Sequence, residues 1–204
     1  MNNTRETIMK AARAAFCKYG YEKASVEDIA KMANRAKTSI YYYFDSKTDV
    51  FLAVLTEEFD KILSQLIGLV DFSSPEKLAQ TFKVCLKKRM ELITGSELFR
   101  NNYYFRYNGG LSEIVSIMDR AREPFNKREK MMLCDVCLYL KHHGALSDEV
   151  SPDDFSEMFE MYLCGVEVQL FTSNEKDKVM KIYEAMLDGT ARELKKLGDS
   201  NREN

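Results

Sequence analysis

The stretch TSIYYYFDSKTDVF, from Thr38 to Phe51, places three tyrosines in a row between an isoleucine and a phenylalanine. Ile40 and Phe44 are four residues apart, so on a helix they lie on one face and define its buried side. At about 100° per residue, the three tyrosines fan around the opposite surface, and Tyr42 points most directly away from the core. Adjacent exposed rings are unusual on a surface that faces only solvent. Phenolic hydroxyls contact DNA phosphates and ring edges contact sugars and thymine methyls, so the spacing predicts a DNA-binding surface.

Two helices precede this segment, and a tight turn connects the second helix to it. Apolar residues recur at helical spacing up to Gly20, a residue type that commonly ends a helix. Ser25 followed by Asp28 predicts the start of the second helix. Asn34 accepts the left-handed conformation that a tight turn requires, and the third helix is expected to begin near Lys37. Three short helices with a tight turn between the last two are typical of a helix-turn-helix domain.

Charge is distributed unevenly along the 204 residues of the chain. Residues 1–47 contain nine Lys or Arg and five Asp or Glu, a net charge of +4, whereas the whole chain has a net charge of −2. The remainder therefore carries −6. A basic head on an acidic body indicates that only the head binds a polyanion.

The segment from Thr7 to Leu55 resembles, without a gap, the DNA-binding domain of TetR/AcrR-type transcriptional regulators. The matching elements are AARAAF, Gly20, SVEDIA, SIYYYF and the pair Ser46–Lys47, with an apolar helix following. The resemblance implies a homodimeric DNA-binding regulator whose C-terminal helical domain binds an effector.

The resemblance also implies roles for individual residues of the head. Ser25 would bond a phosphate through its hydroxyl at a helix N-terminus. The other residues divide between the major groove and the DNA backbone: Lys37, Thr38, Ser39 and Tyr43 would face the groove, and Tyr41, Tyr42 and Lys47 would contact the backbone. Three turn residues, Asn34, Arg35 and Ala36, stand where the family usually has glycine, an apolar residue and serine. Arg35 either adds a phosphate contact or loosens the turn, and Ala36 removes a cap that contributes about 1 kcal/mol.

The remainder of the chain shows helical periodicity without a strand pattern or an internal repeat. The expected features are a helix from Lys47 to about Val70, a helix from Pro75 to about Thr94, a helix that stops at Gly109–Gly110, a broken stretch around Pro124 before a helix that reaches His143, and two final helices with N-caps at Ser151 and Asn174. We therefore predict an all-α protein. Its helix-turn-helix DNA-binding domain spans residues 1–48, and its effector-binding and dimerisation domain spans residues 49–204.

The last two predicted helices carry more apolar surface than one buried stripe requires. Gly165 and Gly189 lie in their interiors, where glycine costs about 1 kcal/mol relative to alanine unless close packing compensates. The resemblance implies a homodimer built as a four-helix bundle of these helices. The predicted interface residues are Phe159, Tyr162, Val166, Ile182 and Met186. The alternative is that both helices only complete the core of one chain.

The segment FRNNYYFRYNGG, from Phe99 to Gly110, combines aromatic residues on one face with polar residues beside them. Aromatic walls with a few polar groups are typical of a small-molecule pocket, and they describe an amphipathic core helix equally well. The candidate effector pocket consists of Phe99, Tyr103, Arg106, Tyr107 and Met118. We expect its unidentified ligand to be a small apolar or aromatic molecule.

Cys134 and Cys137 share one helical face, and His142 and His143 follow them. A metal or thiol sensor is one interpretation of this cluster. The other is that the cysteines are core residues and the histidines complement the negative end of a helix. We assign no metal ligands and predict no cofactor. The sequence has no Gly-rich phosphate loop, nucleophile motif or paired-carboxylate signature, so we predict no enzymatic activity.

Targeting signals and cysteine usage indicate where the protein works. The N-terminus lacks an apolar segment of signal-peptide type, and no run approaches the roughly 18 apolar residues of a membrane span. Five unpatterned cysteines fit a reducing cytoplasm. We predict a cytoplasmic homodimeric repressor, without a membrane partner, that a small effector releases from a palindromic double-stranded DNA operator. A metal or thiol sensor that binds DNA and a helical protein-interaction module are the alternatives.

Overall fold

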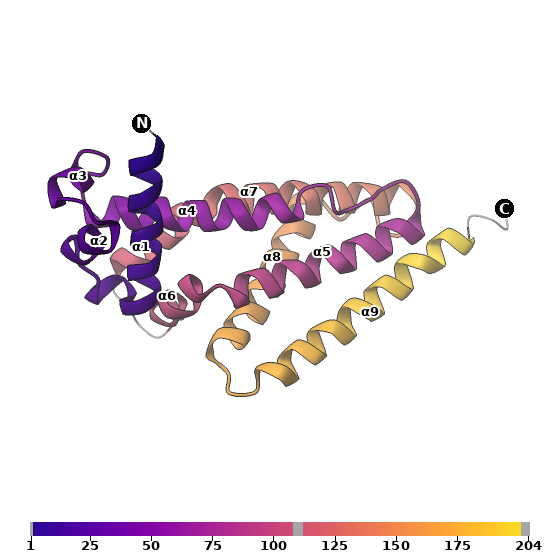
Figure 1. The fold of residues 1–204 in the computed structure, drawn as a ribbon. Helices are drawn as coiled ribbons and strands as arrows, with labels where there is room; N and C mark the ends of the chain where they lie inside the picture. The colour runs from indigo at the N-terminus through magenta and orange to yellow at the C-terminus, as the bar shows by residue number, and fades with distance from the viewer. Residues whose placement is uncertain (1, 108–111, 201–204) are drawn as a thin grey trace. The chain divides into compact units, whose positions relative to one another are not determined.

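The computed structural model describes the backbone of residues 2–107 and 112–200 and the side chains of residues 4–103, 113–192 and 195. Every regular element within these ranges is an α-helix (Figure 1). The helices are α1 (Asn2–Lys23), α2 (Val26–Ala33), α3 (Lys37–Tyr41), α4 (Lys47–Leu66), α5 (Pro75–Gly95), α6 (Glu97–Tyr107), α7 (Ser112–His142), α8 (Pro152–Thr172) and α9 (Lys176–Ser200). The prediction of an all-α fold is confirmed. Among these helices, none combines the length and the apolar character needed to cross a membrane.

Contacts within the chain divide it into two compact units. Unit 1 consists of the chain up to Lys61 and of Gly95–Pro124, and unit 2 consists of Ile62–Thr94 and of the chain from Phe125 onward. The three N-terminal helices therefore share their compact unit with α6 and the first part of α7. The predicted boundary between residues 48 and 49 falls inside unit 1, and the division of function at that boundary stays a prediction.

Local side-chain bonds define the helix-turn-helix of unit 1. The Asp28 amide donates to Ser25 Oγ at 3.1 Å, and the Ser25 amide donates to Asp28 Oδ2 at 3.0 Å, so the predicted start of α2 is confirmed. Asn34 adopts φ 50° and ψ 51°, the left-handed conformation expected of the turn. Ala36 precedes α3 without a side-chain cap, as its methyl group requires.

The core of unit 1 is formed where these short helices meet α1 and α4. Ile40 and Phe44 are buried as predicted, with 0% and 7% of their surfaces exposed. The centroid of the Phe51 ring of α4 lies 4.8 Å from the centroid of the Phe16 ring and 4.7 Å from that of the Tyr21 ring. This aromatic cluster fixes α4 against α1.

Helix α7 runs without interruption through Pro124, so the prediction of a broken stretch there was wrong. An interior proline removes one backbone hydrogen bond and crowds the preceding turn, which costs about 3 kcal/mol. Ala121 and Phe125, on either side of the proline, are almost completely buried. Tertiary packing on both sides of Pro124 therefore offsets the local penalty.

Two other helix boundaries also differ from the prediction. Helix α4 ends at Leu66 rather than near Val70, because Gly68 adopts a φ of 76° that a helix does not allow. Helix α9 does not use Asn174 as its cap. The Glu175 carbonyl accepts the first helical bond, from Val179 at 3.1 Å, so the turn begins one residue later.

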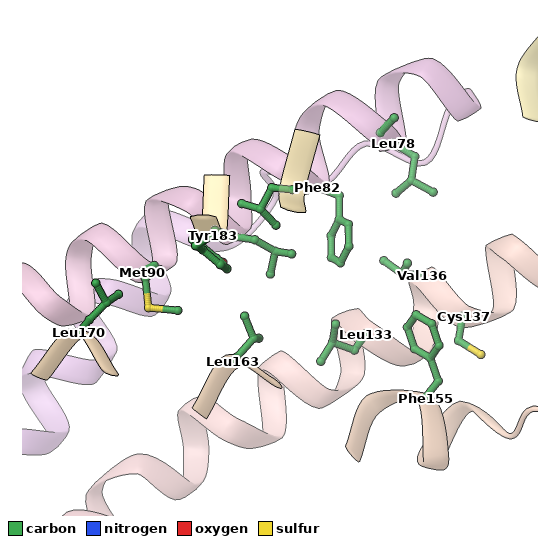
Figure 2. Close-up of a cluster of buried hydrophobic side chains, with 13 residues drawn as sticks. Leu78, Phe82, Met90, Leu133, Val136, Cys137, Phe155, Leu163, Leu170 and Tyr183 are labelled. Carbon is green, nitrogen blue, oxygen red and sulfur yellow. The ribbon is translucent and has the colours of Figure 1, made fainter. Parts of the chain in front are cut away.

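The core of unit 2 is a continuous hydrophobic cluster. Figure 2 shows side chains of α5, α7, α8 and α9 directed into it, including Phe82, Val136, Leu163 and Tyr183. The buried Tyr183 hydroxyl donates to the Leu86 carbonyl at 3.0 Å. The predicted cap at Ser151, which starts α8, is confirmed by a bond of 3.0 Å from the Asp154 amide.

Candidate nucleic-acid interface and ligand cavity

The three tyrosines of the α3 region point away from the core, as their spacing predicts. Tyr42 is 77% exposed and Tyr41 is 45% exposed, whereas Tyr43 is half-buried. The Tyr42 and Tyr43 rings pack edge to face with centroids 4.9 Å apart. The fan therefore presents phenolic hydroxyls and ring edges on one exposed surface. Contact of this surface with DNA stays a prediction.

Lys37 at the start of α3 is already part of an ion pair. Its ammonium group donates to the Glu27 carboxylate of α2 and lies 5.7 Å from the centroid of the Tyr41 ring. The hydrogen bond from Lys37 lowers the pKa of Glu27, and the same bond raises the pKa of Lys37. Both groups are exposed, so the pair is of the weak surface kind. A DNA phosphate can therefore compete with Glu27 for Lys37 at little cost.

Two other predicted DNA contacts have structural partners in unit 1. The Ser25 hydroxyl donates to Asp28 Oδ2 at 2.5 Å, so a phosphate at this helix end would compete with a carboxylate. The Lys47 ammonium donates to the Tyr21 carbonyl at 2.8 Å and lies 4.3 Å from the centroid of the Tyr21 ring. Lys47 therefore stabilises the last turn of α1. Thr38 is exposed and Ser39 is half-buried on α3.

The turn between α2 and α3 adds two exposed cations to this surface. Lys31 lies in the last turn of α2 with its side chain exposed, and the Arg35 guanidinium donates to the Asn34 carbonyl at 3.1 Å. Arg35 is thus held against the backbone of the turn rather than directed into the core. Lys31 is an exposed cation that the predicted set of contacts omitted, although its spacing from Arg35 is visible in the sequence.

Three of the five predicted effector residues lie in the interior of unit 1. Phe99 and Tyr103 are fully buried, and only 1% of Met118 is exposed. The centroids of the Phe99 and Phe59 rings lie 4.5 Å apart, and the Tyr103 hydroxyl accepts a hydrogen bond of 2.6 Å from Arg122 Nη1. The side chains of the other two predicted residues, Arg106 and Tyr107, lie outside the described residues. Binding of an effector by this group stays a prediction.

Unit 2 contains a cavity of about 290 Å³ that the sequence did not predict. Its apolar lining includes Leu63, Leu66, Phe72, Phe125, Met131 and Met132, and its polar lining includes Arg89, Arg128, Glu129 and Asp135. A mostly apolar cavity with a few polar groups is typical of a small-molecule site. The lining comes from three segments that are far apart in the chain, and no local periodicity links them.

A buried ion cluster supplies part of the polar lining. Arg89 Nη2 donates to Glu129 Oε2 at 2.9 Å, and Arg89 Nη1 lies 2.7 Å from Glu167 Oε1. The guanidinium also lies 5.7 Å from the centroid of the Phe125 ring. Burial raises the pKa of the neighbouring Cys85 thiol to about 11, so this cavity residue is neutral at physiological pH.

The predicted dimer residues divide into a half-buried group and an exposed group. Phe159 and Tyr162 are half-buried, and the Phe159 ring lies 4.9 Å from the core residue Phe155. Val166 also packs against the hydrophobic cluster of unit 2. In contrast, Ile182 and Met186 of α9 are 54% and 51% exposed.

The structure adds two exposed methionines to the apolar surface of α8. Met158 and Met161 are 56% and 69% exposed, and Gly165 lies on the same helical face. A Cβ atom built on Gly165 or on Gly189 would meet no atom within 4 Å. Close packing among the described residues therefore does not explain why glycine, rather than a larger residue, occupies these two positions. The assignment of this surface to a dimer interface stays a prediction.

The cysteine and histidine cluster of α7 has structural partners throughout. Cys137 is fully buried in the hydrophobic cluster, and the Cys134 thiol donates to the Pro152 carbonyl at 3.5 Å. The His143 ring stacks on Tyr139 at 4.1 Å, and its Nδ1 lies 2.8 Å from the Tyr139 carbonyl. Among the described residues, no group of three or more His, Cys, Asp or Glu is arranged to hold a metal ion.

Comparisons with known proteins identify the head of the chain. Residues 8–54 match the sequence profile of a family described as bacterial regulatory proteins, tetR family. An uncharacterised HTH-type transcriptional regulator from the lacX 3' region of Lactococcus lactis subsp. lactis is 28% identical over 136 residues, which cover 67% of this chain and 65% of the relative. The HTH-type transcriptional repressor NicS of Pseudomonas putida is 41% identical over 54 residues, 26% of each chain. The aligned segments thus span less than two thirds of either relative.

The similarity to solved structures extends over almost the whole chain. The transcriptional regulator FadR from Bacillus subtilis, in complex with stearoyl-CoA, superimposes with a TM-score of 0.63 over 93% of this chain and 97% of that chain, at 15% identity. At this identity the match establishes a shared fold. The family match over residues 8–54 covers the helix-turn-helix and agrees with the prediction of a regulator rather than an enzyme. Residues 8–54 of this chain thus match the tetR family of bacterial regulatory proteins, and the fold of the chain resembles that of FadR.

Proposed function

We propose that this protein is a homodimeric, cytoplasmic repressor that binds an inverted repeat in double-stranded DNA and is released by a small, largely apolar effector. The observation that carries the proposal is the exposed tyrosine fan of α3 within the segment that matches the tetR family. The name of the relative NicS as a transcriptional repressor supports repression as the outcome of binding.

DNA recognition is assigned to α3 and the turn before it. Lys37, Thr38, Ser39 and Tyr43 would face the major groove. Ser25, Tyr41, Tyr42 and Lys47 would contact the DNA backbone, and Lys31 and Arg35 add two exposed cations beside them. Several phosphate contacts make affinity fall steeply as salt is raised, which distinguishes DNA binding from a protein-interaction role based on apolar helix faces.

Dimerisation is assigned to α8 and α9. Met158, Met161, Ile182 and Met186 each expose more than half of their surfaces. Exposed apolar stripes beside a small residue suit a close helix crossing with a second copy of the chain. A two-fold dimer would place two copies of α3 in successive major grooves about 34 Å apart.

Effector binding is assigned to the cavity of unit 2. Its volume and mostly apolar lining suit a small apolar or aromatic molecule, and the structurally similar FadR was crystallised with stearoyl-CoA, a ligand with a long apolar chain. The residues Phe99, Tyr103 and Met118 remain a second candidate site. We expect the effector to prefer the state of the protein that does not bind DNA. It must then weaken DNA binding by the same free energy by which DNA weakens effector binding, typically 1–3 kcal/mol.

The test of DNA binding is a selection of random duplexes on the purified full chain, followed by sequencing. The wild type is expected to enrich an inverted repeat, and Tyr42→Ala is expected to lose that enrichment. Tyr19→Ala is the matched control, because Tyr19 is an exposed tyrosine of α1 outside the proposed interface. Absence of enrichment by the wild type at low salt would refute the proposed function.

A further inference from the structure

The helical conformation of α1 is interrupted at Gly20. This residue adopts φ 72° and ψ 167°, a combination that glycine tolerates and other residues rarely adopt. A helical bond from the Tyr21 amide to the Cys17 carbonyl requires helical angles at every residue between them. The angles at Gly20 therefore separate the Tyr21 N–H donor and the Cys17 carbonyl acceptor that this bond would otherwise join.

Two neighbouring asparagines of α6 bond to these two backbone groups. The Tyr21 amide donates to Asn102 Oδ1 at 3.3 Å, and Asn101 Nδ2 donates to the Cys17 carbonyl. Asn102 is fully buried, and its Nδ2 donates to the Leu98 carbonyl at 2.7 Å, which fixes its orientation. One donor and one acceptor freed by the break are thus both satisfied by side chains of a single helix. The Tyr21–Asn102 bond is buried, where an unsatisfied backbone N–H is costly, so this bond stabilises the broken form of α1, whereas the Asn101–Cys17 bond is exposed to solvent.

The turn that follows the break is bonded on its other sides as well. The Tyr21 hydroxyl lies 2.9 Å from Thr48 Oγ1 and donates to the Glu113 carboxylate at 3.1 Å. Lys47 donates to the Tyr21 carbonyl at 2.8 Å. The same turn leads through Ala24, whose amide donates to the Gly20 carbonyl, directly into α2. The direction of the chain at Gly20 therefore sets the direction in which α2 and α3 leave α1.

We propose that Asn101 and Asn102 are positioning residues for DNA binding. They replace the helical bond that is missing at Gly20, hold the kink of α1 against α6, and thereby set the orientation of α2 and α3. This inference rests on the proposed function, because orientation matters only if α3 binds DNA. In a dimer, the orientation of each head determines which distance between half-sites is bound best.

The experiment compares half-site spacings. Duplexes carry the two half-sites enriched by the wild type, separated by spacers that differ by one base pair, and binding is measured by fluorescence anisotropy. The wild type is expected to prefer one spacing. Asn102→Leu is expected to bind that spacing about tenfold more weakly and to lose most of the preference over neighbouring spacings, and Asn101→Leu, which removes an exposed bond, is expected to change both in the same direction by less. Arg100→Gln, a change at an exposed neighbour on α6, is expected to retain the wild-type preference.

A local measurement accompanies the binding data. The Tyr21 amide is expected to exchange its hydrogen at least tenfold faster in Asn102→Leu, while core amides of unit 2 exchange at the wild-type rate.

The outcomes separate positioning from stability. Equal weakening at every spacing would show that the asparagines only stabilise the fold and would overturn the inference, as would unchanged binding by both variants. Failure of the wild type to enrich an inverted repeat would instead refute the proposed function itself.

Discussion

The substitution Gly165→Ala separates the folding of one chain from the association of two. Gly165 lies inside α8, and an added Cβ meets no atom within 4 Å. Alanine is about 0.8–1.0 kcal/mol more favourable than glycine in a helix interior, so the folded chain should gain up to that amount. The proposed dimer brings a partner helix against the same face, where Met158 and Met161 are exposed. There the extra methyl group overpacks the contact by about 1–3 kcal/mol.

Two-fold symmetry doubles this effect, because each copy of the chain brings its own methyl group to the interface. Two methyl groups together cost about 2–6 kcal/mol, so the dimer dissociation constant rises at least about thirtyfold. The assay is sedimentation equilibrium over a dilution series, combined with urea unfolding at a protein concentration where the variant is monomeric. We expect weaker dimerisation together with a chain that unfolds at a higher urea concentration.

Gly95→Ala is the matched control. Gly95 is an exposed glycine at the end of α5, and a Cβ built there also meets no atom within 4 Å. It should leave the dimer dissociation constant unchanged. If Gly165→Ala stabilised the chain and also left that constant unchanged, the α8 face would be exposed to solvent in the dimer, and the proposed interface would be refuted.

Three further predictions follow from contacts within the two units. Burial favours the neutral form of Glu58, but hydrogen bonds from Arg13 and Ser96 outweigh burial and hold the pKa of Glu58 below its usual value. The ionised carboxylate therefore stabilises the fold above about pH 4.3, and this contribution is lost as pH falls through the lower folded-state pKa. Glu58→Gln should therefore lower the free energy of unfolding by about 1 kcal/mol at pH 7, and acid titration of both proteins should show this difference shrink as pH falls below about 4.3; a constant difference would contradict the role of the charge. Tyr183→Phe removes the donor to the Leu86 carbonyl and should cost about 1 kcal/mol in urea unfolding with an unchanged slope, whereas an unchanged midpoint would mean that water replaces the bond. Met132→Trp should fill the unit 2 cavity and weaken binding of anilinonaphthalene sulfonate in a fluorescence titration, and unchanged binding would place the probe elsewhere.

The helix-turn-helix could be predicted from the sequence because short-range chemistry determines it. The reciprocal bonds of Ser25 and Asp28, the left-handed Asn34 and the spacing of Ile40 and Phe44 each involve residues no more than four positions apart. Such interactions depend on backbone geometry that a short segment adopts by itself. The exposure of Tyr42 follows from the same spacing, because a helix that buries Ile40 must turn Tyr42 away from the core.

Tertiary structure alone decided the features that join distant segments. The continuity of α7 through Pro124 depends on burial on both sides of the proline, and the unit 2 cavity combines residues that are up to 72 positions apart, from Leu63 to Asp135. Lys47 donates to a carbonyl 26 residues away, and Asn102 accepts from an amide 81 residues away. Hydrophobic periodicity indicates which face of a helix is buried, but it contains no information about which helix covers that face. The partners of these side chains were therefore determined only when the helices packed together.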